Sequence, residues 1–438
     1  MEGHLKTLRE FLLSAYRNGG NLFIIKLIGL ALNYGVLLLI LYYYGFEGNG
    51  EYAVKLELAR GLKVFVVFGL DYLIVKEVTA LIEDYTENTG QLLAVFLFSN
   101  VFFISIFLLL SLFFEIDNNI LYWTLFMAFW RFISHFFRGR DNMLAYGFFE
   151  FAVFQGIVFS SIILANFVFN TMPFESLINI LNLIGLVLCF IVVLPKMAKT
   201  QNLRGFLSLM KKGWNNILRY YKRGLNFVLT NSSNILSVSI LYIIIKDNYS
   251  SEVLGIYDTV LKFAMIISLP LIAVSGRVMT LAAKYFNHKK IRELRNYIGK
   301  VTKMLILGSS ILTIGVCVFF WIYSSYFNLE LKDYWPLFLI LLAAQLVNNW
   351  TGPVGVVLQV SNNEKIFNRI TIISAIYLII STFIFAKFFD IYIIAVNMIV
   401  YLLMINLMSL YVQKKKLGIQ PHADLFRKIH ESDHPKIQ

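Results

Sequence analysis

Long runs of hydrophobic residues follow one another along almost the whole chain, separated by short polar segments. A run of about 20 apolar residues crosses a ~30 Å hydrocarbon core as a helix. Because lipid offers no hydrogen-bonding partners, a spanning backbone must satisfy its own polar groups, which favours α-helices. The pattern predicts an all-α polytopic membrane protein with twelve spans, at about 20–44, 52–78, 91–114, 120–138, 147–169, 175–195, 225–245, 253–283, 298–325, 334–360, 368–387 and 391–412.

The polar segments between these runs differ in charge. Segment 196–223 holds eight basic residues and no acidic ones. If both termini are cytoplasmic, the inside segments hold 28 Lys and Arg residues and the outside segments hold three. Short cytoplasmic loops retain basic residues, so this count predicts that both termini are cytoplasmic. Segment 79–90 fits less well, since it carries three acidic residues and no base.

The basic segment also divides the chain into similar halves. It predicts an N-terminal six-helix lobe (1–195), a basic cytoplasmic linker (196–223), a C-terminal six-helix lobe (224–413) and a cytoplasmic tail (414–438). Parallel repeats with a ligand site between the halves are a transporter architecture. We therefore expect pseudo-two-fold symmetry around a central cavity. A weak repeat at an offset of 205 residues supports this, because Gly50, Tyr52, Leu56 and Ala59 match Gly255, Tyr257, Leu261 and Ala264.

The linker itself allows two interpretations. Its apolar residues could form one face of a helix that lies on the inner leaflet, with the bases contacting anionic headgroups. The simpler interpretation, a connection held near the surface by its charge, is the one the sequence favours. The apolar face would comprise Phe206, Leu207, Leu209, Met210, Trp214, Ile217 and Leu218.

Composition narrows the possible functions. The chain is 58% hydrophobic and 15% charged, with a net charge of +13. The bases cluster at helix ends on one side of the membrane, which argues against a nucleic-acid partner. Cys189 and Cys317 lie inside apolar runs and are interpreted as packing residues rather than a disulfide or metal site. We expect no cofactor, no metal and no enzymatic activity.

Several ionisable residues fall inside the predicted spans. Each costs ~2.5–3.5 kcal/mol at the centre of a span on insertion scales, so it usually faces protein, water or a ligand. Bases outnumber acids, so a shared cavity would be cationic and suit a phosphate or pyrophosphate. The candidate anion-binding residues are Lys26, Arg60, Lys63, Arg131, Lys262 and Arg277.

Some of these charges have simpler explanations. Arg60 can pair with Glu57 within its own helix, Lys262 can pair with Asp258, and Arg131 can snorkel to the interface. Carboxylates in spans are candidates for a coupling ion, since a buried carboxylate can carry a proton. These candidates are Glu57, Asp71, Glu150 and Asp258.

Helix-breaking residues occur inside two spans. Pro270 lies in the eighth span, and Gly352 and Pro353 lie in the tenth. Proline removes a helical hydrogen bond, so each position predicts a kink. Broken helices line cavities in alternating-access carriers, which makes these residues candidate hinges. A static kink filled by packing is the alternative.

Two segments resemble a known family. LGIYDTVLKFAMIISLPLIAV (254–274) and GPVGVVLQVSNNEKIFNRI (352–370), followed by FFDIY and KKKLGI, are similar to polysaccharide exporters of the multidrug/oligosaccharidyl-lipid/polysaccharide (MOP) superfamily, and most of all to O-antigen flippases. The usual small-residue run before the last span is replaced here by IYIIAV, which affects packing more than chemistry.

The resemblance implies two six-helix lobes around a cavity. It also implies a cargo of undecaprenyl-pyrophosphate-linked oligosaccharide, for lipopolysaccharide or another surface polysaccharide, moved outward across the bacterial inner membrane. Alternating access would be driven by a proton or sodium gradient, as in an antiporter, or by membrane potential. The expected partners are this cargo, membrane lipids and the coupling ion, for a monomer that can associate with polysaccharide assembly proteins. Tyr34, Tyr52 and Tyr257 are candidates for stacking on sugars.

Three alternatives share part of this pattern. A membrane-embedded polysaccharide polymerase or ligase would need a long outer loop, and every predicted outer loop is short. A drug exporter of the same superfamily would favour an acidic cavity. A peptidoglycan-precursor flippase would carry two further spans where this chain has a polar tail.

Overall fold

The computed structural model describes residues 2–80, 85–169, 172–198, 203–326 and 329–420, and within them the chain is helical with no strand. The all-α prediction is confirmed. Ten helical segments among these residues are long and apolar enough to span a membrane. Two differences account for the count of ten against the twelve predicted spans. Segment Ile24–Val67 joins the first predicted span to most of the second, and helix α8, which contains the seventh predicted span, is not among the ten segments. The protein is a multi-pass membrane protein.

The chain forms two compact units. The first unit is Asn18–Gly255, and the second unit combines Met1–Arg17 with Ile256–Gln438. Each unit is described by itself below. The predicted division into lobes on either side of 196–223, and a cavity between them, stay predictions.

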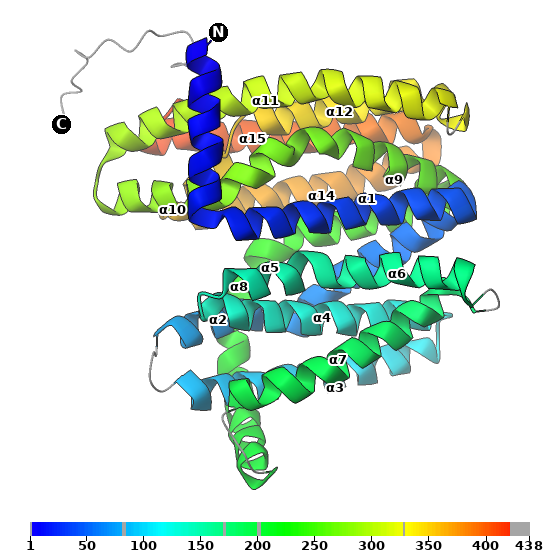
Figure 1. Cartoon of the computed structure of the whole chain (residues 1–438), viewed down its shortest axis with the longest axis vertical. Coiled ribbons are helices and arrows are strands. Elements are labelled where there is room, and N and C mark those ends of the chain that lie inside the picture. Colours follow the sequence, from blue (N-terminus) through cyan, green and yellow to red (C-terminus); the bar gives the residue numbers. More distant parts are fainter. Residues whose placement is uncertain (1, 81–84, 170–171, 199–202, 327–328, 421–438) are drawn as a thin grey trace. The chain divides into compact units, whose positions relative to one another are not determined.

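The first unit is a bundle in which α4, α6 and α7 run alongside one another (Figure 1). Its elements are α1 (Glu2–Val67, from Asn18 onward), α2 (Leu70–Ala80), α3 (Tyr85–Ser111), α4 (Asn118–Gly139), α5 (Met143–Gly147), the π-helix η1 (Phe148–Ala152), α6 (Val153–Phe167), α7 (Phe174–Ala198) and α8 (Leu203–Asn248).

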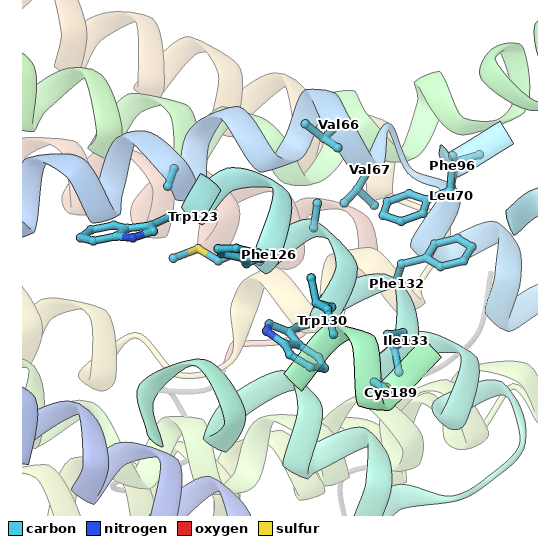
Figure 2. Packing of buried hydrophobic residues seen from close by; sticks show 14 of the residues in the cluster. Val66, Val67, Leu70, Phe96, Trp123, Phe126, Trp130, Phe132, Ile133 and Cys189 are labelled. Atoms are coloured by element: carbon cyan, nitrogen blue, oxygen red, sulfur yellow. The ribbon is translucent and has the colours of Figure 1, made fainter. Parts of the chain in front are cut away.

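Aromatic side chains fill the core of the first unit around α4 (Figure 2). Phe132 stacks on Phe96 of α3 with ring centroids 4.3 Å apart. The Trp130 indole N–H donates to Asn182 Oδ1 of α7 at 2.9 Å, so the polar edge of this buried ring is satisfied. In lipid, such close packing and interhelical hydrogen bonds hold helices together. The core therefore fixes α4 against α2, α3 and α7.

Two positions in α1 and just beyond it bend the chain. Gly45, with φ of +67°, marks the turn between the first two predicted spans, which otherwise form one continuous helix. Phe68 and Gly69 both have positive φ and separate α1 from α2, so the predicted span 52–78 is broken there. A Cβ at Gly69 would lie 2.5 Å from the carbonyl oxygen of Gly224. Glycine is therefore required by conformation and by space.

The repeat-related glycines contact one another close to the bend at Gly45. A Cβ on Gly50 would lie 1.7 Å from the Ser251 carbonyl oxygen, and one on Gly255 would lie 1.8 Å from that of Phe46. Phe46 and Ser251 are themselves 205 positions apart, so the contact is reciprocal about the repeat. Asn49 donates to the Gly255 carbonyl at 3.0 Å. The internal repeat thus coincides with a close backbone crossing.

The second unit is a bundle in which α11, α12 and α15 lie side by side (Figure 1). Its elements are α9 (Ser251–Met265, from Ile256 onward), the 3₁₀-helix η2 (Ile266–Ser268), α10 (Leu269–Asn287), α11 (Ile291–Tyr326), the 3₁₀-helix η3 (Leu329–Tyr334), α12 (Trp335–Trp350), α13 (Val354–Val360), α14 (Glu364–Phe388) and α15 (Ile391–Leu417).

Both predicted kinks are breaks in the second unit. Pro270 occupies the first turn of α10, directly after η2. Gly352 has a φ of +79°, and Pro353 separates α12 from α13. A hydrogen bond links the two breaks: the side-chain amide of Asn349, near the end of α12, donates to Ser268 Oγ, just before α10, at 3.1 Å. The broken helices are confirmed, and their role as moving hinges stays a prediction.

Candidate functional site

Buried ionisable side chains gather in the first unit, on four of its elements. Lys63 comes from α1, Asp71 from α2, Arg131 and His135 from α4, and Glu150 from η1. We call these five residues the charge cluster. The sequence placed each of them inside a span, but only the fold brings them together.

Arg131 is the centre of the charge cluster. Its Nε donates to Asp71 Oδ2 at 2.6 Å, and its Nη1 donates to Glu150 Oε1 at 2.9 Å. His135 lies between the same carboxylates, with Nε2 3.9 Å from Asp71 Oδ2 and Nδ1 3.8 Å from Glu150 Oε2. The guanidinium has five N–H donors and these contacts use two. It therefore retains donors for a further anion.

The break at Phe68 and Gly69 positions Asp71. It places this carboxylate in the first turn of α2, where Oδ1 accepts from the backbone N–H of Tyr72 at 3.0 Å. A helix N-terminus favours a negative charge. The side chain is 4% exposed, so its pairing with Arg131 takes place away from bulk water.

A π-helical turn positions Glu150. Phe148–Ala152 form η1 between α5 and α6, and such turns inside α-helices are frequent at functional sites. Glu150 Oε2 accepts from Ser134 Oγ at 2.7 Å while Oε1 accepts from Arg131. Neither the π-helical turn nor Ser134 was predicted, because no local feature of the sequence marks either one.

Lys63 lines a cavity beside the charge cluster. The cavity has a volume of about 30 Å³, and its lining includes Arg131, Asp71 and Tyr72. Within the part of the chain that the structure describes, no carboxylate lies within ion-pairing distance of the Lys63 ammonium. Asp71 and Glu150 act on it only from a longer range. The remaining lining is mostly apolar and comprises Val64, Val67, Gly69, Val228 and Ile235.

Two other predicted bases of the first unit lie outside this cavity. Arg60 forms an ion pair with Glu57 one turn earlier, as their spacing allows. Lys26 lies over the ring of Phe151, with Nζ 5.3 Å from the centroid, next to the Glu150 turn. Arg60 is thus neutralised within its own helix, whereas Lys26 adds positive charge near the cluster.

The predicted bases of the second unit are placed separately. Lys262 forms an ion pair with Asp258 at 2.6 Å, with both side chains largely buried. Arg277 is half-buried on α10 and acts electrostatically on Tyr297 of α11. All four candidate ion-coupling carboxylates therefore pair with bases, Asp258 here and Glu57, Asp71 and Glu150 in the first unit.

The expected sugar-stacking role of two tyrosines is wrong. Tyr52 is 1% exposed and Tyr257 is 0% exposed, so neither offers a ring face to a ligand. The Tyr52 ring packs against Trp123 with centroids 5.6 Å apart. Both tyrosines belong to the internal repeat, so their shared role in the two segments is to pack in the interior and not to line a cavity.

A second ionic cluster lies near the start of α4 and was not predicted. Lys55 Nζ is 2.6 Å from Asp117 Oδ2 and 2.8 Å from Glu175 Oε1. Burial alone would raise the pKa of Asp117, but hydrogen bonds from Lys55 and the Asn119 backbone lower it below its usual value. The cluster links α1, α4 and α7. Sequence gives no signal for it, because the partners are far apart along the chain.

Replacing Arg131 by Met is expected to lower the unfolding temperature of the protein in detergent markedly. The substitution removes the arginine that holds Asp71 and Glu150, and removing one partner of a buried pair costs about 3–5 kcal/mol. Arg292→Met, at an exposed arginine, is the matched control. Equal unfolding temperatures for both variants would show that the charge cluster does not hold α2, α4 and η1 together.

Comparison with known proteins gives matches at the level of structure. No protein-family model and no curated protein sequence matches the chain. The MATE multidrug transporter DinF-BH, solved in complex with a bound compound, matches with a TM-score of 0.59 and 15% identity, over 91% of this chain and 95% of that one. An outward-facing MATE family multidrug resistance transporter of the MOP superfamily matches with a TM-score of 0.56 and 11% identity, over 91% and 95%.

A third match differs in its site. It is a MOP superfamily transporter from Pyrococcus furiosus Vc1 (DSM3638), with a TM-score of 0.56 and 13% identity over 93% of this chain and 96% of that one. The reverse polarity of its binding pocket suggests a different function for that protein. The matches extend over nearly the full length of each chain, and the predicted layout of twelve helices in two lobes is consistent with them. The chain has the fold of the MATE transporters of the MOP superfamily.

Proposed function

We propose that this protein is a flippase that moves a lipid-linked oligosaccharide across the bacterial inner membrane by alternating access. The cargo is a pyrophosphate headgroup bearing a glycan, carried on a polyprenyl tail that stays in the bilayer. Both termini face the cytoplasm in this proposal. Two things support it: the transporter fold, and the similarity of segments 254–274 and 352–370 to O-antigen flippases.

The main observation behind the proposal is that, of the two bases lining the cavity in the first unit, one forms ion pairs and the other does not. Arg131 already holds the two carboxylates of the charge cluster, while the Lys63 ammonium faces the cavity without an ion-pairing carboxylate among the described residues. An uncompensated base in a partly buried cavity attracts an anion. Lys63 is thus the main pyrophosphate-binding residue, and the remaining Arg131 donors assist it.

Ion pairing separates the candidate binding residues in this proposal. Arg60 and Lys262 are each held by a carboxylate on their own helix, so we assign them to structural ion pairs. Lys26 stays in the set because it lies over Phe151 of the same π-helical turn that carries Glu150. Glu150 and Asp71 are the coupling-ion candidates nearest to the proposed cargo site.

The second candidate function is drug export. It is favoured by the match to a multidrug transporter solved with a bound compound and by the presence of Asp71 and Glu150 in the charge cluster. A cationic drug needs a carboxylate that is free to bind it. Both carboxylates are bound to Arg131, so drug export has the weaker support.

Transport in proteoliposomes tests the proposal. Purified protein is reconstituted with a polyprenyl-pyrophosphate-linked saccharide, and the fraction of saccharide that becomes accessible to an external glycosidase is followed over time. We expect the protein to accelerate exposure over protein-free vesicles, and a cationic dye not to compete. Exposure at the protein-free rate, together with uptake of the dye, would favour drug export instead.

A further inference from the structure

The first part of α8 presents an unusual surface. The helix runs without a break from Leu203 to Asn248, so its basic start is continuous with the segment that contains the seventh predicted span. We call residues 208–225 the α8 arm. Side-chain exposure along the arm separates into two faces, and each face has its own chemistry.

One face of the α8 arm packs on α3. A Cβ on Gly213 would lie 2.6 Å from the Cβ of Ala94, so the two helices touch backbone to side chain there. Asn216 Nδ2 donates to Gln91 Oε1 at 3.1 Å, and the Trp214 ring meets Phe98 edge-on, with centroids 5.0 Å apart. These contacts attach the arm to one end of α3.

The same contacts fix the depth of Trp214. Phe98 is nine residues into Thr89–Ser111, a segment apolar and long enough to span the membrane. At 1.5 Å per residue, Phe98 lies about 13 Å from the start of that segment. An indole at this level lies at the membrane interface or deeper. Figure 1 shows the first turns of α8 crossing the direction of α3 rather than extending it.

The face of the α8 arm turned away from Gly213 and Asn216 is apolar and exposed, and Trp214 lies at its border, where its ring also contacts Phe98. Trp214, Leu218 and Leu225 are 58%, 72% and 45% exposed, and their spacing puts them on one stripe of the helix. Trp at a membrane interface places its ring among acyl chains and its N–H among headgroups. The stripe therefore has the composition of an interfacial helix.

Basic residues flank this stripe. Lys211, Arg219 and Lys222 are exposed, and no acidic residue occurs between 208 and 225. The neighbouring Arg223 differs, because it is held by Glu77 of α2 at 2.6 Å. Long basic side chains beside an apolar stripe extend to the headgroup level. Their charge complements anionic headgroups, and each base near such a surface favours binding by about fivefold.

From this arrangement we propose that the exposed face of the α8 arm is a binding surface for anionic phospholipids of the membrane that the protein spans. Trp214, Leu218 and Leu225 insert between acyl chains, and Lys211, Arg219 and Lys222 hold the phosphate headgroups. The surface selects phosphatidylglycerol-type lipids over zwitterionic ones. This inference needs only the membrane-spanning fold and is independent of the cargo.

Fluorescence quenching by brominated lipids tests this surface in the full-length protein. The protein is placed in nanodiscs with brominated phosphatidylglycerol or brominated phosphatidylcholine at equal mole fraction. Subtracting the signal of Trp214→Phe isolates the emission of Trp214 from that of the other tryptophans. We expect both lipids to quench Trp214. Brominated phosphatidylglycerol should reach a given degree of quenching at roughly one-fifth or less of the mole fraction that brominated phosphatidylcholine requires.

A triple variant with Lys211, Arg219 and Lys222 changed to Gln should lose the anionic preference while keeping the quenching. Lys284, Lys289 and Arg292 changed to Gln remove the same number of exposed charges elsewhere, and this control should keep the preference. Equal quenching of the wild-type protein by the two lipids would overturn the proposal. So would quenching by aqueous iodide without quenching by lipid, since the arm would then face water and a soluble partner.

Discussion

Replacing Lys63 by Ala is expected to abolish surface polysaccharide in cells that depend on this protein, without loss of the folded protein. The Lys63 ammonium lines the cavity with no carboxylate at ion-pairing distance among the described residues, and a hydrogen bond to a charged group contributes about 1.5–3 kcal/mol. Loss of one such contact to pyrophosphate weakens cargo binding by about 10- to 100-fold. The measurement is the amount of exported polysaccharide relative to the membrane level of the protein.

Two variants make this result specific. Lys63→Arg keeps the charge and should retain much of the export. Lys76→Ala removes an exposed base on the neighbouring helix α2 and should export like the wild-type protein. Normal export by Lys63→Ala at a normal protein level would remove the basis for the anion-binding cavity.

Replacing either Gly50 or Gly255 by Ala should prevent the protein from reaching its native fold. The new methyl group would lie less than 2 Å from a backbone carbonyl oxygen, at 1.7 Å for Gly50 and 1.8 Å for Gly255. Overpacking usually costs about 1–3 kcal/mol, and here the obstacle is backbone, which cannot rotate away. The yield of monodisperse protein in detergent and its unfolding temperature measure the effect.

Gly156→Ala is the matched control for this crossing. A Cβ there meets only Leu32 Cδ1 at an ordinary 3.7 Å, and alanine is the better helix former by about 1 kcal/mol. This variant should be as stable as the wild-type protein or more so. If Gly50→Ala and Gly255→Ala were both as stable as Gly156→Ala, the two backbone segments around Gly50 and Gly255 would not pack as closely as the structure shows.

Much of the fold follows from local features of the sequence. Apolar run lengths predict the spanning helices, and Pro270 and Pro353 correctly mark two breaks. The break at Phe68–Gly69 was missed because an isolated glycine in an apolar run is also compatible with a continuous helix. Its cause is the approach of the Gly224 carbonyl, a contact between residues more than 150 positions apart.

The candidate site was predicted in its parts but not in its arrangement. Spacing within one helix correctly suggested the Glu57–Arg60 and Asp258–Lys262 pairs. Arg131 was named as a cargo ligand, whereas in the fold it also holds Asp71 and Glu150. Those pairings depend on the α2 break and on the π-helical turn η1. Local periodicity contains no information about either. Spacing alone favoured Lys63, Lys26 and Arg277, because none has a partner on its own helix, but it could not rank Lys63 above the other two.

The central claim is that the cavity beside Lys63 binds an anionic headgroup. Equilibrium binding of a polyprenyl-pyrophosphate-linked saccharide to the purified protein, compared with a cationic dye and repeated with Lys63→Ala, tests it most directly. The account predicts saturable binding of the pyrophosphate compound that weakens about tenfold or more in the variant. Dye binding without pyrophosphate binding, or pyrophosphate binding that is unchanged by Lys63→Ala, would contradict it.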